Sequence, residues 1–520
     1  MLTKLLRQSG TYAVANVVAK GSGFVLLAFY QNPAYLAQAE FGYLGGLDAL
    51  KGLAVLVAGV GLPLGLIRFA LAGDLDDRER AAVPATSLAL AVVAGSAVAA
   101  LGWGLASPVA AALLGDAALA DPVRWLAAYV ALKTVADISY TEIRRRERAD
   151  LYVAASLVET VVLVGAVAYF LAAAGEGLIG VMKGYVVSTG VMAAGLTPLL
   201  LANVERRLRW SLVGPMLAFG LPLIASGLAN RFLNIGDRFL ILHFLGPEAN
   251  AAYEWAARFG GILNSLLVQS FQMAFVVLGL KALDADGTPD LHRRTFRHYT
   301  ALAGFAVLGL GLFATDLARL LPIVEAAVTS VLGVAVGPIP ERGGEIASVY
   351  LQQEGLIALI AGGFAFYGLY VLAVTVLYAA GRTRAVAASV GGAALLNLVL
   401  NVVLIPTVGL LGAAIATLAS YAALAFATAI LGERESRAGY PWRVLAVVSG
   451  LVVVLWAAGQ TVADEALPSR LGVRAGLVIA YLAALVAAGI YRREDWDRLR
   501  ALGRRSGGPE AGREHADTSR

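Results

Sequence analysis

The sequence predicts an all-α, polytopic membrane protein with 14 transmembrane helices, and two observations lead to that prediction. The first is composition: 59% of the 520 residues are hydrophobic and only 15% are charged, whereas a soluble globular chain carries about 25% charged residues. The second is that the apolar residues gather into fourteen long stretches. About 20 apolar residues in a helix cross the hydrocarbon core of a bilayer.

The first six stretches are expected to form one lobe. The first follows Lys4 and Arg7 and continues to Tyr30 without a small-residue cleavage site, so we expect a retained helix rather than a removed signal peptide. The second contains Pro63 after a glycine, a combination that permits a bend. The expected spans are 8–30, 41–71, 82–106, 125–142, 151–174 and 177–202.

The next six stretches are expected to form a second lobe, and two more follow it. The seventh contains Pro222 near its start, where a second bend is expected. The expected spans are 212–244, 250–280, 298–318, 352–379, 385–405, 409–432, 444–460 and 472–491. The domains are then 1–211, 212–440 and 441–491, with 492–520 as a cytoplasmic tail whose charged, glycine-rich composition predicts disorder.

The basic residues alternate between loops, as expected when cytoplasmic loops hold the excess of Lys and Arg. With the N-terminus inside, the inner loops and tail hold 28 of the 41 Lys and Arg residues, and the outer loops hold 5. This bias predicts a multi-pass protein of the cytoplasmic (inner) membrane with both termini cytoplasmic. For the connection 319–351, which contains Glu325, we expect a helix at the outer interface rather than another crossing.

Several short motifs lie in a characteristic order along residues 8–432. Residues 219–260 contain Gly220-Leu221-Pro222 and Asp237-Arg238-Phe239, and residues 380–421 contain Asn397 and Asn401 before an Ile-Pro turn. The N-terminal part adds Ala19-Lys20, Glu40-Phe41-Gly42 and Ile67-Arg68-Phe69. Together these segments resemble the polysaccharide transporter family, the Wzx-like O-antigen and lipid-linked oligosaccharide flippases of the multidrug/oligosaccharidyl-lipid/polysaccharide exporter superfamily. The long 319–351 connection departs from the family pattern.

The resemblance implies two six-helix lobes arranged in a V, with two further C-terminal helices, working by alternating access. It implies a polyprenyl-diphosphate-linked oligosaccharide as cargo and membrane lipid as a partner. A glycan polymerase or glycosyltransferases could be additional partners.

Basic residues inside the spans are the main candidates for function, because each charge at a helix centre costs about 2.5–3.5 kcal/mol on insertion scales. Helical spacing predicts the ion pairs Asp48–Lys51, Lys133–Asp137 and Glu254–Arg258. Five cations have no such acid on their own helix, namely Lys20, Arg68, Lys183, Arg231 and Arg238. We expect Asp237 to point away from its neighbour Arg238, and Lys183 to extend toward the membrane surface.

A diphosphate headgroup needs cations to replace its lost hydration, and Arg and Lys supply them. The candidates for contact with the headgroup are Lys20, Lys51, Arg68, Arg231, Arg238 and Arg258. Candidates for contact with sugar hydroxyls are Asn16, Asn230, Asn234 and Asn264, although hydrogen bonds between helices explain such amides equally well. Acids that could couple transport to an ion gradient are Asp48, Asp237 and Glu254, which could instead be plain charge partners.

The sequence offers little support for enzymatic chemistry or for a cofactor. It contains no Cys, which excludes thiolate metal sites, and its four His residues form no metal-spaced cluster. No GxxxxGK[ST] phosphate loop is present. The net charge of +5 follows the membrane loops and does not indicate nucleic acid. We therefore expect no catalytic residues, no metal and no cofactor.

Three alternatives to the flippase hypothesis remain open at this stage. One is a flippase for the lipid-linked peptidoglycan precursor. Another is a cation-coupled multidrug exporter of the same superfamily, for which a cavity rich in acids and aromatics would be expected. The third is a membrane-embedded polysaccharide polymerase or ligase, for which the 319–351 connection is the only outer loop large enough to consider.

Overall fold

The computed structural model describes residues 21–71, 75–202, 204, 207–272, 275, 288–333, 350, 353–436, 439–463 and 465–490. Within these ranges the chain consists of helices joined by short turns, and no strand occurs there. Ten of the described helices, or up to eleven if a bent pair counts as one, are long and apolar enough to cross a membrane. The all-α membrane fold is therefore confirmed, while the count of 14 crossings stays a prediction.

Each expected span of the first lobe contains helix in the described residues. The helix Gly21–Tyr30 lies in the first expected span. It is followed by α2 (Gln38–Gly59), α3 (Leu62–Ala70), α4 (Asp77–Gly104), α5 (Ala106–Leu114), α6 (Ala120–Arg145), α7 (Ala149–Ala168) with the π-helix Tyr169–Ala173, and α8 (Gly177–Ala202). The bend expected at Pro63 is present, since α2 and α3 are separated by Val60 and Gly61, which have φ of 45° and 67°.

The remaining expected spans also contain helix. They correspond to α9 (Val213–Ile235) with α10 (Asp237–Leu245), α11 (Pro247–Leu263) with the π-helix Asn264–Val268, α13 (Thr288–Ala318), α16 (Glu354–Ala379), α17 (Thr383–Val408), α18 (Leu410–Ser436), α19 (Trp442–Gln460) and α20 (Leu467–Ala487). The short helix α14 (Leu321–Leu332) lies between α13 and α16. The predicted tail 492–520 falls outside the described residues.

Some helices begin earlier than their apolar stretch because polar residues complete their first turn. The span expected from residue 82 begins at Asp77, where the carboxylate of Asp76 accepts a hydrogen bond from the Glu79 amide. A capping Asp satisfies a backbone N–H that the helix itself leaves without a partner. Hydropathy alone does not report this turn, since all its residues are polar.

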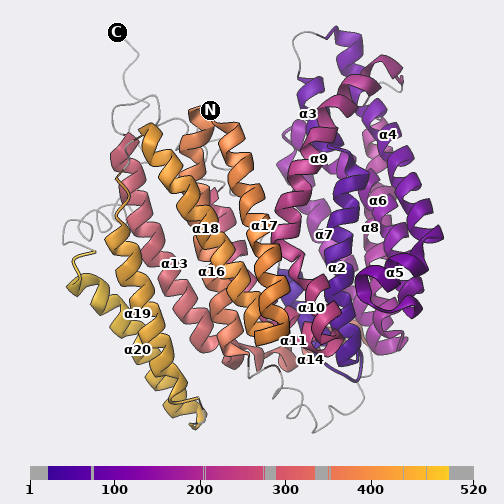
Figure 1. Ribbon diagram of the computed structural model, residues 1–520. Helices are drawn as coiled ribbons and strands as arrows, with labels where there is room; N and C mark the ends of the chain where they lie inside the picture. The colour runs from indigo at the N-terminus through magenta and orange to yellow at the C-terminus, as the bar shows by residue number, and fades with distance from the viewer. Residues whose placement is uncertain are drawn as a thin grey trace, which may run out of the picture.

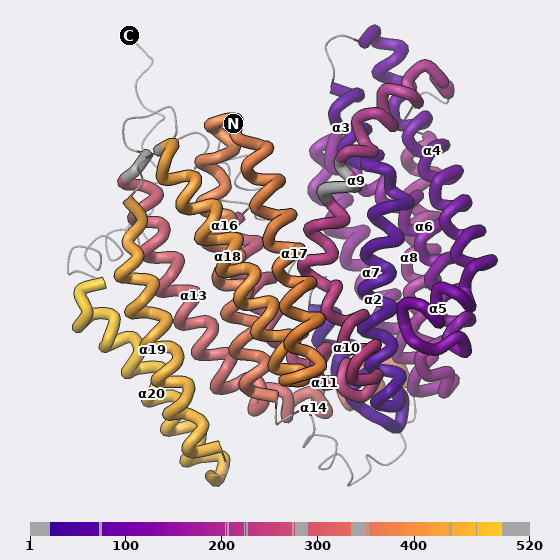
Figure 2. Tube along the Cα trace, viewed as in Figure 1, coloured from indigo at the N-terminus to yellow at the C-terminus, as the bar shows by residue number. Residues whose placement is uncertain are grey.

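The helices form two bundles that converge at one end and diverge toward the other (Figures 1 and 2). The helices α10, α11 and α14 lie at the converging end, which we call the α14 end (Figure 1). The helix α9 packs against α2 and α3 of the first bundle and also against α17 of the second, so it connects the two.

Glycines allow the two bundles to approach closely at the α14 end. A Cβ atom on Gly42 of α2 would overlap the carbonyl oxygen of Pro247, the first residue of α11. One turn further, a Cβ on Gly45 would lie 3.0 Å from the Asn250 amide nitrogen. That amide donates a 2.7 Å hydrogen bond to the Gly42 carbonyl. This contact between α2 and α11 is called the glycine seam.

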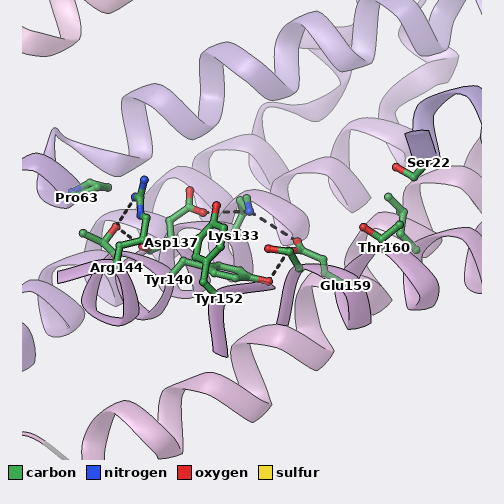
Figure 3. Close-up of a pocket in the computed structure, with 12 residues that line it drawn as sticks. Ser22, Pro63, Lys133, Asp137, Tyr140, Arg144, Tyr152, Glu159 and Thr160 are labelled. Atoms are coloured by element: carbon green, nitrogen blue, oxygen red, sulfur yellow. Dashed lines mark hydrogen bonds and ion pairs between the residues drawn. The ribbon is translucent and has the colours of Figure 1, made fainter. Parts of the chain in front are cut away.

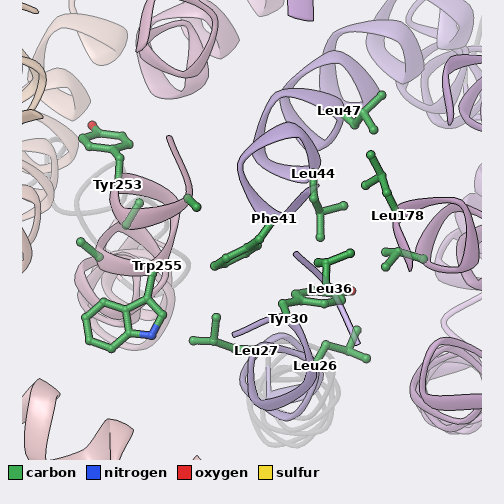
Figure 4. Packing of buried hydrophobic residues seen from close by; sticks show 14 of the residues in the cluster. Leu26, Leu27, Tyr30, Leu36, Phe41, Leu44, Leu47, Leu178, Tyr253 and Trp255 are labelled. Atoms are coloured by element: carbon green, nitrogen blue, oxygen red, sulfur yellow. The ribbon is translucent and has the colours of Figure 1, made fainter. Parts of the chain in front are cut away.

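Aromatic rings surround the glycine seam and exclude water from it. Tyr350 stacks on Trp255 of α11 with ring centroids 5.6 Å apart and meets Phe41 of α2 edge-on at 6.3 Å. Figure 4 shows Phe41 lying between Tyr30 and Trp255, with leucines of both α2 and the first helix behind it. One continuous apolar cluster therefore includes residues of both bundles at this end.

A short helix, α14, is present in the connection where an interfacial helix was expected. Its 12 residues extend about 18 Å at 1.5 Å per residue, which is too short to cross a bilayer. It lies at the converging end, beneath the junction of the bundles (Figure 1). The structure therefore agrees with the prediction that this segment does not make a further crossing, within residues 321–333.

We predict that Gly42→Ala separates α2 from α11. The added methyl group overlaps a backbone atom that cannot move independently, and such overpacking costs about 1–3 kcal/mol of unfolding free energy. The control is Gly59→Ala in the same helix, where nothing lies within 4 Å of the new Cβ, so a helix-propensity gain of up to about 1 kcal/mol is expected. Thermal unfolding of the detergent-solubilised variants measures both, and equal midpoints would contradict the seam.

Candidate functional site

The candidate site is a chain of alternating charges that joins the two bundles about halfway along α2 and α11. On α2, the Lys51 ammonium lies 2.5 Å from the Asp48 carboxylate, which confirms the spacing-based pair. The same carboxylate lies 3.2 Å from the guanidinium of Arg258 on α11. Asp48 also accepts a hydrogen bond from the Tyr185 hydroxyl at 3.1 Å. Asp48 therefore links a cation of its own helix to a cation of the opposite bundle.

The chain of charges continues on the second bundle. Arg258 lies 3.2 Å from Glu254, as the i,i+4 spacing predicts, and Glu254 lies 3.3 Å from Arg238 of α10. Arg238 in turn lies 2.7 Å from Asp237, whose other oxygen accepts a hydrogen bond from Tyr253. Three cations and three carboxylates thus alternate, and the set is electrically balanced.

One expectation about this site is wrong, because Asp237 points toward Arg238 rather than away from it. The Arg238 guanidinium turns back toward α9, donates to the Asn234 carbonyl, 3.1 Å away, and meets the Asp237 carboxylate. Its second acid, Glu254, lies on another helix, which spacing along one helix cannot reveal.

Two other headgroup candidates have no acidic partner among the described residues. Arg231 on α9 is exposed, with its guanidinium directed along Gly52 of α2. Arg68 near the end of α3 is also exposed, and its guanidinium lies 4.4 Å from the Phe219 ring. An exposed arginine partway along an apolar helix must face water or headgroups. Lys20 and Asn16 lie outside the described residues.

The amide candidates are brought together in part. Asn230 is exposed beside Arg231, and Asn234 donates to the Asn230 carbonyl at 2.6 Å and accepts from the Tyr421 hydroxyl. Asn264 begins a π-helix at the end of α11, and its side-chain oxygen is buried without a hydrogen-bond partner. The two α9 amides therefore lie beside an uncompensated arginine, whereas Asn264 lies on a different helix.

A second polar cluster lies inside the first bundle and was expected only in part. A cavity of about 420 Å³ between α6 and α7 is lined by Lys133, Asp137, Tyr140 and Glu159, among others (Figure 3). Lys133 lies 3.0 Å from Asp137, confirming the predicted pair, and 3.7 Å from Glu159, which also accepts from Tyr140 at 2.7 Å. These contacts neutralise the charge of Lys133, which lies near the middle of α6.

Lys183, for which helical spacing offers no acid, has an acidic partner in the structure. Its ammonium lies 2.7 Å from Glu176, which precedes the first turn of α8 and is seven residues away. Two helical turns separate the residues in sequence. Helical spacing therefore does not reveal the pair.

A third ionic cluster was missed entirely because its members are far apart in sequence. Arg470 and Arg474 of α20 both contact Asp316 of α13, at 2.5 and 2.9 Å, and Arg474 also contacts Glu354 of α16 at 3.0 Å. The Arg474 side chain is 1% exposed. The only sequence signal was two arginines, four residues apart, at the start of an apolar stretch. They join the last two helices to the second bundle.

We predict that Asp316→Asn loosens α19 and α20 from the second bundle. Removing one partner of a buried ionic pair leaves an uncompensated charge and costs about 3–5 kcal/mol. The matched control is Asp121→Asn, which breaks an exposed pair with Arg124 worth about 0–1 kcal/mol. Thermal unfolding and limited proteolysis of α19–α20 report the difference, and a small effect from both variants would contradict this assignment.

Comparison with known proteins places this arrangement in a family. The family model described as polysaccharide biosynthesis protein matches residues 35–321, more than half of the chain. No curated protein matches the chain over its sequence.

The fold is shared with several solved membrane transporters. The lipid II flippase MurJ in an inward closed conformation has a TM-score of 0.71 at 10% identity, with 94% of this chain and all of that chain covered. An inward-facing MATE-family multidrug resistance transporter of the MOP superfamily has a TM-score of 0.63 at 15% identity, with 82% and 99% covered. A MOP superfamily transporter from Pyrococcus furiosus has a TM-score of 0.56 at 13% identity, with 83% and 96% covered.

Proposed function

The chain belongs to the polysaccharide biosynthesis protein family, and from that premise we propose that it is a flippase for a polyprenyl-diphosphate-linked oligosaccharide. The cargo would move from the inner to the outer leaflet of the cytoplasmic membrane by alternating access. The step is translocation, and no covalent chemistry is part of the proposal. The fold shared with MOP superfamily transporters supports the transport class, and the charged side chains support the diphosphate.

The observation that carries the proposal is the six-residue charge chain between the bundles, with Arg231 exposed nearby. Of the described cations along these helices, Lys51, Arg238 and Arg258 are held by carboxylates, while Arg231 is not. A diphosphate is an acceptor of the same kind as a carboxylate and has more oxygens. It can therefore replace Asp48 or Glu254 as the partner of an arginine without leaving a bare charge in the membrane.

This exchange gives the charges a role in the transport cycle. In the empty protein, Asp48 holds Arg258 across the bundles at 3.2 Å. When a diphosphate takes Arg258, the ionic link from α2 to α11 is lost, and the contacts that remain at that end include the glycine seam and its aromatic rings. Binding would thereby favour separation of the bundles at the α14 end, which the distribution of basic residues assigns to the outer side.

An apolar groove on the second bundle could hold part of the lipid tail. A cavity of about 390 Å³ lies between α13, α16, α18 and α19, and its lining includes Val307, Leu359, Leu418 and Trp456. Its surface is almost entirely hydrocarbon, as a polyprenyl chain requires. The headgroup could then pass between the bundles while the tail stays in contact with apolar side chains.

The sugar contacts are proposed for the amides beside Arg231. Asn230 and Asn234 lie on the same helix as this arginine, three residues or fewer away, and Tyr421 already hydrogen-bonds Asn234. A saccharide next to the diphosphate would meet these amide and phenol groups first. The coupling acids Asp48, Asp237 and Glu254 act in this proposal as the carboxylates that the cargo displaces.

We predict that Arg231→Ala slows movement of a fluorescent polyprenyl-diphosphate saccharide across reconstituted vesicles by about tenfold or more. One charge-assisted hydrogen bond contributes about 1.5–3 kcal/mol, and 1.4 kcal/mol is a factor of ten. Because Arg231 is exposed and has no described acidic partner, the fold should be unchanged. Lys20→Ala, tested beside it, examines the corresponding candidate of the first helix.

The control is Arg80→Ala, which removes a partly exposed cation paired with Asp77 in the first turn of α4 and should leave the rate within about twofold. A peptidoglycan-type headgroup on the same lipid tests the second candidate cargo, which shares the diphosphate chemistry. Unchanged rates for both Arg231→Ala and Lys20→Ala would refute the headgroup site.

A further inference from the structure

We propose that α14 is a strap that holds the two bundles together at the outer side, and that Glu325 locks it to the first bundle. The strap, Leu321–Leu332, must lift each time the outer side opens. This inference rests on the proposed function for its direction and adds a gate to it. It also gives a role to the connection 319–351, which no part of the headgroup site uses.

The strap belongs to one bundle by sequence and packs on the other. It follows α13 of the second bundle directly, since Ala318 and Leu321 are three residues apart. Leu321 is buried in the apolar cluster that contains residues of both bundles, with Val324 and Val328 packed against that cluster. At its far end, the Leu332 side chain lies 4.0 Å from the position of a Cβ on Gly165 of α7.

One acidic side chain makes the specific contact. Glu325 is 6% exposed, and its carboxylate accepts a 3.0 Å hydrogen bond from Asn32, in the turn after the first helix. Tyr35 of the same turn hydrogen-bonds it as well. Burial raises the pKa of the Glu325 carboxyl, while these two donors oppose the rise. The pKa of Tyr35 is raised to about 12 by burial and by Glu325, so its hydroxyl keeps its proton and can donate.

The polarity of the strap is the reverse of that of a helix lying on a protein in water. Its buried face carries Leu321, Glu325 and Thr329, at i, i+4 and i+8. Its outward face carries Ile323 and Val331, which are 66% and 87% exposed. Apolar residues facing outward suit the membrane interface. Glu325 faces the protein, so it stabilises α14 only while α14 is docked. If α14 moved into lipid, the carboxylate would have no partner.

The other end of the same connection crosses the glycine seam. Tyr350, four residues before α16, stacks on Trp255 and meets Phe41. Trp255 also donates a 3.2 Å hydrogen bond to Gln31, the neighbour of Asn32. At one described end of the connection, Glu325 contacts Asn32 in the turn after the first helix. At the other, Tyr350 packs on Trp255, which bonds to Gln31 of the same turn. Separation of the bundles would break both contacts, and the one at Glu325 is a direct polar contact to the first bundle.

The first experiment cross-links the strap to the first bundle. The chain contains no Cys, so Gly165→Cys with Leu332→Cys introduces one pair of thiols that spans the bundles. A short bifunctional methanethiosulfonate joins them reversibly. We expect the joined protein to move the fluorescent polyprenyl-diphosphate saccharide at least tenfold more slowly, and a reductant to restore the rate. The control pair, Leu317→Cys with Leu320→Cys, joins only α13 to the start of the strap and should change the rate by less than twofold.

The second experiment needs no transport. Glu325→Ala is compared with Thr329→Ala in the 165/332 cysteine pair. Thr329 lies on the same buried face but donates only to backbone carbonyls of α14. We expect Glu325→Ala to slow cross-linking about tenfold, because the strap spends less time docked, and Thr329→Ala to leave it unchanged.

The outcomes separate the two proposals. A joined pair that transports at the unjoined rate, or equal cross-linking in both alanine variants, would overturn the strap. If the unjoined protein itself moves no lipid-linked saccharide, the proposed cargo is wrong, while the cross-linking comparison still decides whether Glu325 locks α14.

Discussion

The cost of a bare charge at membrane depth is the constraint from which most of this structure follows. A charged side chain there must find a partner, water or a ligand. In the described residues, the protein meets this condition with the Lys183–Glu176 pair and with three larger groups of ion pairs. One lies inside the first bundle around Lys133, one fixes α20 to the second bundle through Arg474, and one joins the bundles through Asp48 and Arg258. Only the third lies where the bundles would have to part.

The position of the third group explains why it can serve transport while the other two serve stability. Arg474 is 1% exposed and bonded to two acids and to a backbone carbonyl, so no ligand can reach it. Lys51 and Arg258 are 22% and 18% exposed, which leaves one side of each accessible. The glycine seam and its aromatic rings close the protein on the α14 side of these residues. Ligand would therefore reach them from the diverging end of the bundles.

The sequence was sufficient to predict the features that depend on residues close together in the chain. Apolar length predicted the long helices but not the short α5, and Gly61 with Pro63 predicted the break between α2 and α3. Helical spacing predicted three ion pairs, because i,i+3 and i,i+4 residues share a helix face. Composition and charge around Glu325 were enough to expect a short helix in that connection, and α14 is present there.

What could not be predicted depends on contacts between distant segments. The Asp48–Arg258 pair joins residues 210 positions apart, and the Arg474 cluster joins three helices. Asp237 was expected to point away from Arg238, but the Arg238 side chain turns back to reach it and also reaches Glu254 of α11. Nothing in the sequence singled out Asn250, which bonds across the glycine seam to Gly42. Spacing rules describe one helix at a time and carry no information on which helices meet.

The central claim is that carboxylates of the protein and the diphosphate of the cargo compete for the same cations. Binding of a short-chain prenyl diphosphate to the purified protein, measured by titration calorimetry for wild type and for folded Asp48→Asn, tests it most directly. Asp48→Asn frees Arg258 and Lys51 from their shared competitor. The account predicts tighter diphosphate binding, by about tenfold, which corresponds to 1.4 kcal/mol. Binding that is unchanged or weaker in Asp48→Asn would contradict it.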